Sequence, residues 1–261
     1  MIIFKSINRL NKEVNFKANI GFVPTMGALH KGHFSLIKSS KKKCKKTLVS
    51  IFVNPSQFNK KNDYKNYPRN LKRDIKILKI LKVDYLLIPK INEIYKNKKT
   101  MKIKLNKKDK ILCVKYRPGH FEGVLAIINQ FLINIKAKFM FLGEKDYQQI
   151  HLLKKFIKSK FKTKIIPCKT VRLNNSLAYS SRNFLLSKNE IQKASLISNS
   201  VRSFYLSIKK KFSNKNNINE IKKNIESKRI KVDYFELRNK KNLSKKIDKN
   251  NFKIFIAYYI N

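Results

Sequence analysis

Short apolar runs alternate with longer amphipathic segments through the first two thirds of the chain. The runs are rich in β-branched and aromatic residues and predict five buried strands, at residues 20–23, 47–52, 85–88, 139–142 and 163–166. The segments between them carry apolar residues at three- and four-residue spacing, which predicts helices with one buried face. Because strands that alternate with helices form parallel units with right-handed crossovers, we predict an α/β fold. Its core would be a Rossmann-like parallel sheet with helices on both faces.

The clearest helical spacing falls at residues 33–43, 70–81, 124–135 and 150–157. The Lys-rich stretch 93–114 is weakly patterned. Two short edge strands are the structure we expect there, at 101–105 and 111–114, with lysines that guard the edges against further pairing.

The pattern changes after Pro167. Ser187 and Glu190 form a capping box, which predicts a helix that runs to about residue 211. A shorter helix at 218–225 and two strands, at 230–237 and 252–260, complete this part of the chain. We therefore predict two domains, a Rossmann-like domain at 1–169 and a smaller α+β domain at 170–261.

The chain is strongly basic, with 62 Lys and Arg residues against 15 Asp and Glu residues and a formal net charge of +47. A charge of this size is typical of proteins that bind nucleic acid. Only nine of the basic residues are Arg, however, and the lysines are spread along the whole chain beside many Asn, Ile and Phe residues. An even spread indicates a compositional bias rather than one binding face, so we expect no specific nucleic-acid partner.

Membrane and redox signals are weak. The sequence has no apolar run near the roughly 20 residues of a membrane span, and residues 1–5 lack the layout of a signal peptide. Three scattered cysteines form neither a metal spacing nor a disulfide framework. We expect a cytoplasmic protein with no membrane partner.

The loop after the first predicted strand carries the strongest candidate chemistry. Residues 24–33 read Pro-Thr-Met-Gly-Ala-Leu-His-Lys-Gly-His and lead into a predicted helix. A glycine-bearing loop between strand and helix presents backbone N–H groups at the positive end of the helix dipole, which suits a phosphate. His30 and His33 lie three residues apart, so both imidazoles would share one face and donate hydrogen bonds to phosphate oxygens. Together these features favour a nucleotide site over two histidines in an ordinary turn.

Two more polar loops follow predicted strands, where open α/β sheets place their ligands. Asn54 and Gln57 follow the second strand and could hold a hydroxyl or carboxylate, although ordinary turn residues look the same. Lys145 follows the fourth strand and opens the next helix, so we expect it at the same sheet edge as His33.

Other polar residues carry less information on their own. Ser180, Ser181 and Arg182 form a loop whose hydroxyls and planar guanidinium can bind phosphate. Asp74 shares the helix 70–81, where a lone Asp is usually a solvated charge. His120 precedes the helix 124–135, and capping or packing is its commoner role, with a role in the site left open.

Five blocks of the sequence resemble the pantothenate synthetase family (pantoate–β-alanine ligases), of the His-x-Gly-His nucleotidyltransferase-like superfamily. They lie at residues 24–33, 52–58, 120–124, 143–149 and 177–183, in the family's order and spacing. One block can match by chance, but five in order are highly specific. The stretch around 101–112 adds little to the resemblance.

The resemblance implies an enzyme that joins (R)-pantoate to β-alanine with ATP, through a pantoyl-adenylate intermediate, and releases AMP and pyrophosphate. It also implies Mg²⁺, a homodimer, and a C-terminal domain that covers the active site. The implied catalytic residues are His30, His33, Lys145 and Arg182. The implied ATP-binding residues are Met26, Gly27, Ala28, Leu29, His30, Lys31, Gly32, His33, Gly143, Glu144, Lys145, Asp146, Val171, Tyr179, Ser180, Ser181 and Arg182. Gln57, Gln149 and Asn54 are the candidates for pantoate and β-alanine, and Asp74 is the candidate for magnesium.

Two departures and two alternatives stay open. Asn175-Ser176 stands where the family usually has Asp-Gly, and Tyr179 stands where it has Met. A lost glycine can alter a turn, which bears on the rate and on the adenine-side fit. Another nucleotidyltransferase of the same superfamily would share the His-x-Gly-His motif. A basic nucleic-acid-binding protein would need a clustered basic face and none of the five blocks.

Overall fold

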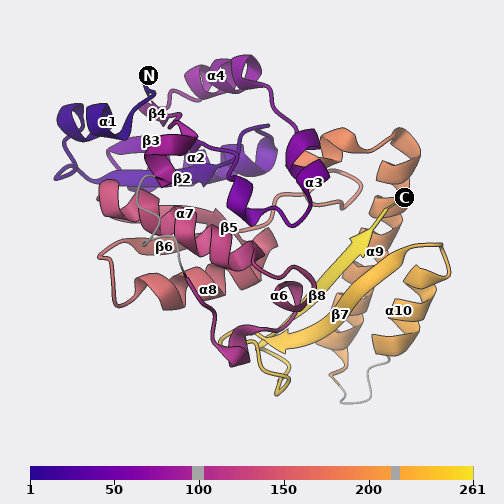
Figure 1. Ribbon diagram of the computed structural model, residues 1–261. Coiled ribbons are helices and arrows are strands. Elements are labelled where there is room, and N and C mark those ends of the chain that lie inside the picture. The colour runs from indigo at the N-terminus through magenta and orange to yellow at the C-terminus, as the bar shows by residue number, and fades with distance from the viewer. Residues whose placement is uncertain (96–102, 213–217, 261) are drawn as a thin grey trace. The chain divides into compact units, whose positions relative to one another are not determined.

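The computed structural model describes residues 1–95, 103–212 and 218–260, and the chain forms two compact units (Figure 1). Unit 1 comprises Met1–Lys110, Arg117–Val171 and Tyr179–Phe184. Unit 2 comprises Ile111–Tyr116, Arg172–Ala178 and Leu185–Asn261. The units interleave along the sequence, so the boundary at residue 169 stays a prediction about folding domains.

Six strands form the sheet of unit 1, in the spatial order β1-β4-β3-β2-β5-β6. They are β1 (Ile2–Phe4), β2 (Ile20–Thr25), β3 (Lys46–Ile51), β4 (Tyr85–Leu87), β5 (Phe139–Gly143) and β6 (Lys164–Cys168). Every pairing between them is parallel, so all the carboxyl ends meet at one edge of the sheet. The Rossmann-like sheet that we predicted is confirmed. The apolar pattern missed β1, because three residues are too few to show an alternation.

The helical segments of unit 1 connect these strands. They are α1 (Ile7–Glu13), α2 (Lys31–Lys43), η1 (Pro55–Gln57), α3 (Lys61–Asn66), α4 (Leu71–Ile80), α5 (Ile91–Tyr95), η3 (Lys107–Asp109), α7 (His120–Asn134), η4 (Glu144–Asp146), α8 (Tyr147–Ile157) and η5 (Ser181–Leu185), whose last residue belongs to unit 2.

The two predicted edge strands are not borne out in the part of the chain that the structure describes. Residues 103–105 lie outside any strand, while 101–102 fall outside the described residues. Instead of a strand at 111–114, α6 (Cys113–Tyr116) forms a short helix in unit 2.

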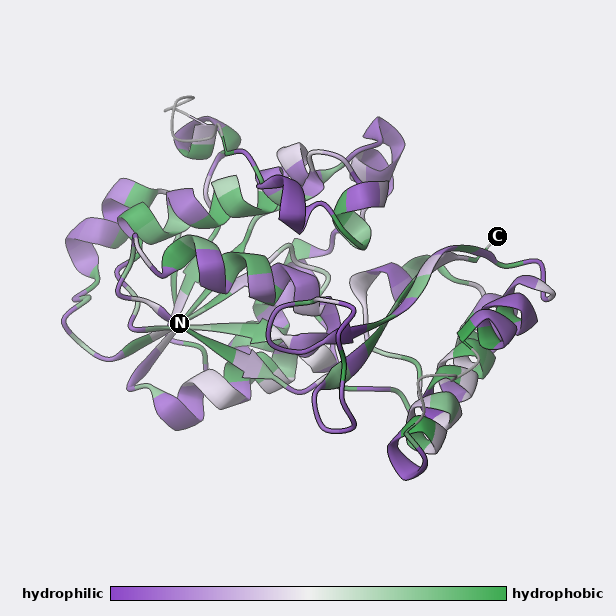
Figure 2. Ribbon diagram, turned by 90° about the horizontal axis from the view of Figure 1, so that it is seen from below, coloured by the Kyte–Doolittle hydropathy of each residue, from purple (hydrophilic) through white to green (hydrophobic). Residues whose placement is uncertain are grey.

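Alternate residues of the strands face opposite sides of the sheet, and different helices cover the two faces. Val23 packs with Ile37 of α2 and Leu78 of α4 in one buried cluster. Phe22, the preceding residue of β2, meets Phe131 of α7 edge-on, with ring centroids 5.5 Å apart. The strands are accordingly hydrophobic, while the covering helices also carry hydrophilic positions (Figure 2). Helices therefore lie on both faces of the sheet, as predicted.

The order in which the chain adds strands to the sheet reverses between β2 and β5. The chain passes from β2 to β3 through α2, and from β5 to β6 through α8, while β2 and β5 are neighbours in the sheet. In open α/β sheets, ligands bind at the carboxyl ends of the strands where the strand order reverses in this way. The topology thus places a site beside the ends of β2 and β5.

Unit 2 is a small α+β unit. Helices α9 (Lys188–Lys210) and α10 (Ile218–Glu226) pack against an antiparallel pair, β7 (Lys231–Asn239) and β8 (Phe252–Tyr259), around a cluster of buried apolar residues. The predicted capping box opens α9: Glu190 N–H donates to Ser187 Oγ (3.3 Å), and Ser187 N–H donates to Glu190 Oε2 (2.7 Å). Among the described residues of both units, no helix combines the length and the apolar character that a membrane crossing requires.

Candidate active site

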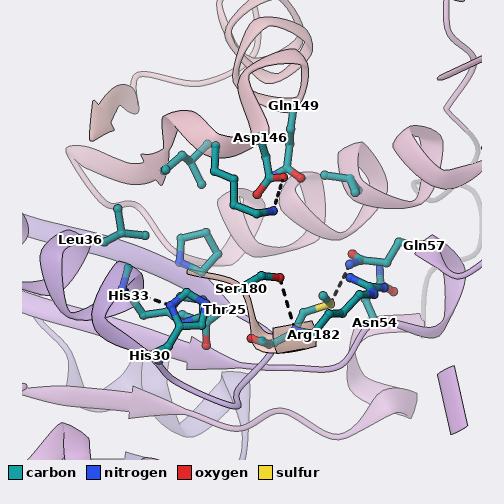
Figure 3. A pocket seen from close by; sticks show the side chains of 18 of the residues that line it. Thr25, His30, His33, Leu36, Asn54, Gln57, Asp146, Gln149, Ser180 and Arg182 are labelled. Carbon is teal, nitrogen blue, oxygen red and sulfur yellow. Dashed lines mark hydrogen bonds and ion pairs between the residues drawn. The ribbon is translucent and has the colours of Figure 1, made fainter. Parts of the chain in front are cut away.

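A cavity of about 260 Å³ lies at the carboxyl ends of β2, β3, β5 and β6, and unit 1 supplies all of its lining (Figure 3). Its volume is near the lower end of the range for small-molecule sites. The predicted site residues that line it are Met26, His30, Gly32, His33, Asn54, Gln57, Gly143, Lys145, Asp146, Gln149, Val171, Tyr179, Ser180, Ser181 and Arg182. The predicted residues outside this lining are Gly27, Ala28, Leu29, Lys31, Asp74 and Glu144.

His30 and His33 cap the start of α2 reciprocally. Gly32 N–H donates to Nδ1 of His30 (3.1 Å), and His30 N–H donates to Nδ1 of His33 (3.4 Å). Because both Nδ1 atoms accept, each neutral ring carries its proton on Nε2. The rings lie together as predicted, with centroids 4.0 Å apart. The pair therefore offers two Nε2–H donors beside a helix N-terminus.

Both imidazoles are neutral at pH 7. Burial lowers the pKa of His30 to about 4, and the nearby Lys145 ammonium acts in the same direction. Burial lowers the pKa of His33 to about 3, with help from His30 and Lys145. The histidines are thus uncharged hydrogen-bond donors, and the cavity's positive charge comes from lysine and arginine.

The backbone N–H groups of the loop differ from our expectation of a phosphate cradle. Those of Gly27, Ala28, Leu29, His30 and Gly32 all donate to protein side chains. A phosphate at this place would therefore meet imidazole N–H groups and cations before these backbone groups. The sequence could not show this, because the acceptors are side chains whose direction depends on the fold.

Asp74 is not the solvated charge that its helical position suggested. Its side chain is 1% exposed, and Oδ2 and Oδ1 accept from the N–H groups of Ala28 and Leu29, each at 2.8 Å. Burial raises the pKa of Asp74, and the two N–H bonds offset part of that rise. No group of three or more His, Cys, Asp or Glu side chains that could hold a metal exists among the described residues. These contacts do not fit the magnesium role considered for Asp74.

Lys145 and Arg182 are the predicted cations of the cavity, which Arg117 and Lys169 also line. Lys145 follows β5, as predicted, and its Nζ lies 3.1 Å from Oδ1 of Asp146 (Figure 3). Nη2 of Arg182 donates to both carboxylate oxygens of Asp63, at 3.1 and 3.0 Å. The guanidinium also lies 5.4 Å from the ring centroid of Tyr67. Asp63 thus holds Arg182 in place, across a sequence separation that left no local signal.

The loop after β3 is fastened to the start of α7. Nδ1 of His120 lies 2.6 Å from the carbonyl oxygen of Gln57, so Nδ1 carries the proton and donates. Nδ2 of Asn54 donates to the carbonyl oxygen of Gly123 at 3.1 Å. A Cβ atom on Gly123 would lie 2.4 Å from the carbonyl oxygen of Ser56, so only glycine allows this approach. His120 is therefore both packed and at the site, which sequence reasoning left open.

Asn54 and Gln57 have different roles in this loop. Asn54 is 1% exposed, and its Oδ1 accepts from the hydroxyls of Ser56 and Tyr95. Both ends of its amide therefore hold the loop. Gln57 lines the cavity, its Oε1 accepts from Nδ2 of Asn54 at 3.3 Å, and its Nε2 donates to the weak acceptor Sδ of Met26 at 2.7 Å. A ligand oxygen could replace that contact, so Gln57 is the better candidate for substrate binding.

Sequence reasoning missed the apolar wall of the cavity. Its main members are Phe52, Val124, Ile127, Ile128 and Phe131. Helix α7 buries 11 of its 15 residues, so it meets more than one partner. A helix that is apolar on nearly every side is the signal that could have indicated a second buried surface.

The two departures from the family pattern have local explanations. Ser176 adopts φ of 70°, and Leu173 N–H donates to the carbonyl oxygen of Leu177 at 2.8 Å, so the turn forms without glycine. Tyr179 stacks on His30, with centroids 6.0 Å apart and an interplanar angle of 17°. The aromatic ring therefore adds a contact that supports the histidine pair.

The fold and site together define a nucleotide-binding α/β enzyme, with its cavity where the strand order reverses and with neutral and cationic donors at a helix N-terminus. The profile of the family described as Pantoate-beta-alanine ligase matches residues 2–261. A pantothenate synthetase of Francisella tularensis subsp. novicida is 41% identical over 265 residues, which cover 100% of this chain and 94% of the relative. The chain belongs to the pantoate–β-alanine ligase family and is a ligase of pantothenate biosynthesis.

Solved structures agree with this assignment. A pantoate–β-alanine ligase from Francisella tularensis, complexed with β,γ-ATP and β-alanine, has a TM-score of 0.86 and 38% identity, covering 100% of this chain and 94% of the other. The pantothenate synthetase of Thermus thermophilus has a TM-score of 0.88 and 28% identity, covering 94% and 89%.

Proposed function

We propose that this protein condenses (R)-pantoate with β-alanine, using ATP, to give pantothenate, AMP and pyrophosphate. The observation that carries the proposal is the lining of one cavity, which combines two chemically different sets of side chains. His30 and His33 supply neutral Nε2–H donors, and Lys145 and Arg182 supply positive charge, which together suit a triphosphate. Gln57, Gln149 and apolar side chains of α7 supply the amides and the apolar surface.

The first step would form pantoyl adenylate. A carboxylate oxygen of pantoate attacks the α-phosphorus of ATP, and the bond from that phosphorus to the bridging oxygen of pyrophosphate breaks. Negative charge accumulates on the departing pyrophosphate, where His33, Lys145 and Arg182 would stabilise it. The protein forms no covalent bond in this step and contributes by orientation and charge.

The second step would form the amide. The β-alanine amine attacks the acyl carbon of pantoyl adenylate, the bond from that carbon to the AMP oxygen breaks, and the nitrogen loses a proton. Less new charge develops near the triphosphate positions, because pyrophosphate has already left. The residues that bind the triphosphate would therefore matter less here than in adenylation.

Pantoate would bind beside the apolar side chains and the amides of the cavity. Its two methyl groups match apolar side chains such as Val124, Ile128 and Phe131, while Gln57 and Gln149 can bond its hydroxyl and carboxylate oxygens. Met26, Gly143, Val171 and the segment 179–182 would complete the ATP site. Asn54 would position Gln57, because its Nδ2 donates to Oε1 of Gln57 at 3.3 Å, rather than touch the substrate.

Three further properties belong to the proposal. Mg²⁺ would enter with ATP, and no step above is routed through it. A homodimer and a cytoplasmic location, which the resemblance to the family implies, also belong to the proposal. Sedimentation equilibrium would test the dimer. Nucleic-acid binding would be weak and sequence-independent, and it would disappear as salt rises.

The test is an assay for AMP with pantoate and β-alanine omitted in turn. AMP release should require both, and the product should have the mass of pantothenate. The His33→Ala variant, purified in parallel, controls for a host enzyme that copurifies. AMP release that ignores pantoate, or that depends on tRNA, would contradict the proposal and favour another nucleotidyltransferase of the superfamily.

A further inference from the structure

The loop before α2 has a backbone that needs support. Gly27 and Ala28 both adopt positive φ, at 79° and 49°. Glycine takes this left-handed conformation readily, whereas alanine has a Cβ atom that disfavours it. The next residues, Leu29 and His30, lead directly into the helix that carries both histidines. The position of the imidazoles therefore depends on a turn that Ala28 does not favour by itself.

One buried carboxylate supports this turn from the side of α4. Its two oxygens accept from two consecutive N–H groups, those of Ala28 and Leu29, each at 2.8 Å. Consecutive N–H groups in such a turn form a concave site that attracts anions. In this protein Asp74 occupies that site, and bonds to an ionised carboxylate are stronger than bonds to a neutral acceptor.

The opposite side of the turn is held as well. The Ser181 hydroxyl lies 3.1 Å from the carbonyl oxygen of Ala28 and 3.4 Å from that of Gly27. Thr25 Oγ1 accepts from Gly27 N–H at 3.2 Å. Ser181 and Thr25 are neutral, so Asp74 is the charged member of the three side chains that hold this turn.

We propose that Asp74 is a positioning residue for adenylation. This inference rests on the proposed function. Its carboxylate fixes the left-handed turn at Gly27 and Ala28, and through Leu29 it sets the start of α2. The Nε2–H groups of His30 and His33 are thereby aimed into the cavity. Asp74 itself touches the loop rather than the substrate.

The test compares Asp74→Asn, the double variant Asp74→Asn with Ala28→Gly, and a control variant in the two half-reactions. Asp74→Asn keeps the shape of the side chain, but its amide NH₂ group would face the backbone N–H of Ala28 or Leu29, so that one of the two hydrogen bonds is lost. Adenylation should slow by about 10²-fold, the effect of a displacement near 1 Å, while attack of β-alanine on preformed pantoyl adenylate should change by less than about threefold. Adding Ala28→Gly should restore about tenfold, because glycine adopts the turn without the carboxylate.

Asp84 provides a matched control. Its carboxylate also accepts a backbone N–H, from Thr47 at 2.9 Å, and pairs with Lys46, but it lies at the opposite edge of the sheet. Asp84→Asn should lower the melting temperature without changing the ratio of the two half-reaction rates. If Asp74→Asn behaves like Asp84→Asn, the carboxylate only stabilises the fold and the proposal is wrong.

A second readout does not need activity. Hydrogen exchange of the Ala28 and Leu29 amides, followed by NMR, should be slow in the parent and at least about tenfold faster in Asp74→Asn, because the acceptors are lost. Unchanged exchange would overturn the proposal. So would a raised Mg²⁺ requirement that Ala28→Gly does not relieve, since that result would make Asp74 a metal ligand.

Two outcomes keep the inference separate from the function. If the parent enzyme fails to adenylate pantoate while the amide exchange behaves as expected, the proposed function is wrong and the role of Asp74 in the loop stands. If Asp74→Asn does not fold, Asp74→Glu keeps the charge but moves the carboxylate by one methylene. The same selective loss in adenylation is then expected, and equal losses in both half-reactions would contradict the proposal.

Discussion

Gly123→Ala should disturb pantoate binding through backbone contact alone. A Cβ atom at this position would lie 2.4 Å from the carbonyl oxygen of Ser56 and 2.9 Å from the backbone nitrogen of Gln57. Ordinary contacts begin at 3.4 Å, so the loop and α7 must separate by about 1 Å. Because the obstacle is backbone, no side-chain rotation can relieve it.

The size of the effect follows from that separation. Overpacking costs about 1–3 kcal/mol, and the better helix propensity of alanine returns about 1 kcal/mol, so the expected net loss of stability is about 1 kcal/mol. The functional loss should be larger, since displacement of a substrate-positioning residue by about 1 Å can lower the rate about 10²-fold. Gln57 belongs to the loop and moves with it, which also stretches the bond from its carbonyl oxygen to His120 of α7.

The assay is steady-state kinetics with pantoate and ATP varied separately. We expect kcat/KM for pantoate to fall about 10²-fold and the KM for ATP to stay within about threefold of the parent value. Ile133→Ala, at an exposed position of the same helix, is the control and should leave both unchanged. If Gly123→Ala binds and uses pantoate like the parent while remaining folded, the loop does not hold the substrate.

Three other predictions concern charge. Lys145→Ala should slow adenylation by about 10²–10³-fold in rapid-quench measurements, whereas Lys154→Ala on α8 should not; equal rates would move the catalytic centre elsewhere. Asp63→Asn should release Arg182 and raise the KM for ATP several-fold, because the remaining contact with the Tyr67 ring is too weak to hold the guanidinium in place. An unchanged KM for ATP would show that Arg182 does not need Asp63. The pKa of His33, lowered by burial to about 3, lies below its unfolded value near 6.5, so the unfolded state binds more protons between these values. The contribution of His33 to the free energy of unfolding should be complete above about pH 6.5 and should fall below that pH by up to about 1.4 kcal/mol per pH unit. In urea titrations, the free energy of unfolding of His33→Gln should fall less steeply with decreasing pH than that of the parent. An identical fall in the two proteins would refute the prediction.

The sequence predicted the parts of the fold that depend on local pattern. Five strands of the sheet follow apolar runs, and the helices between them follow three- and four-residue spacing. The segments that follow those strands hold His33, Gln57 and Lys145 at one cavity, because parallel strands bring their carboxyl ends to one edge. β1 and α6 are too short to produce a period, so they were missed or misassigned.

The sequence could not predict contacts between distant segments. Asp74 looked like a solvated charge and Asp63 was given no role, yet each holds part of the site across 45 and 119 positions of the chain, respectively. The proton positions on His30 and His33 were also hidden, since they depend on which backbone groups reach each ring nitrogen. Three-dimensional placement, rather than residue type, decides these roles.

The most direct test of the account is isotope exchange between pyrophosphate and ATP. If pantoate alone is activated as its adenylate, exchange should require pantoate and proceed without β-alanine, and Lys145→Ala should reduce it at least about 10²-fold. Exchange in the absence of pantoate, or exchange that appears only when β-alanine is also present, would contradict the pantoyl-adenylate route.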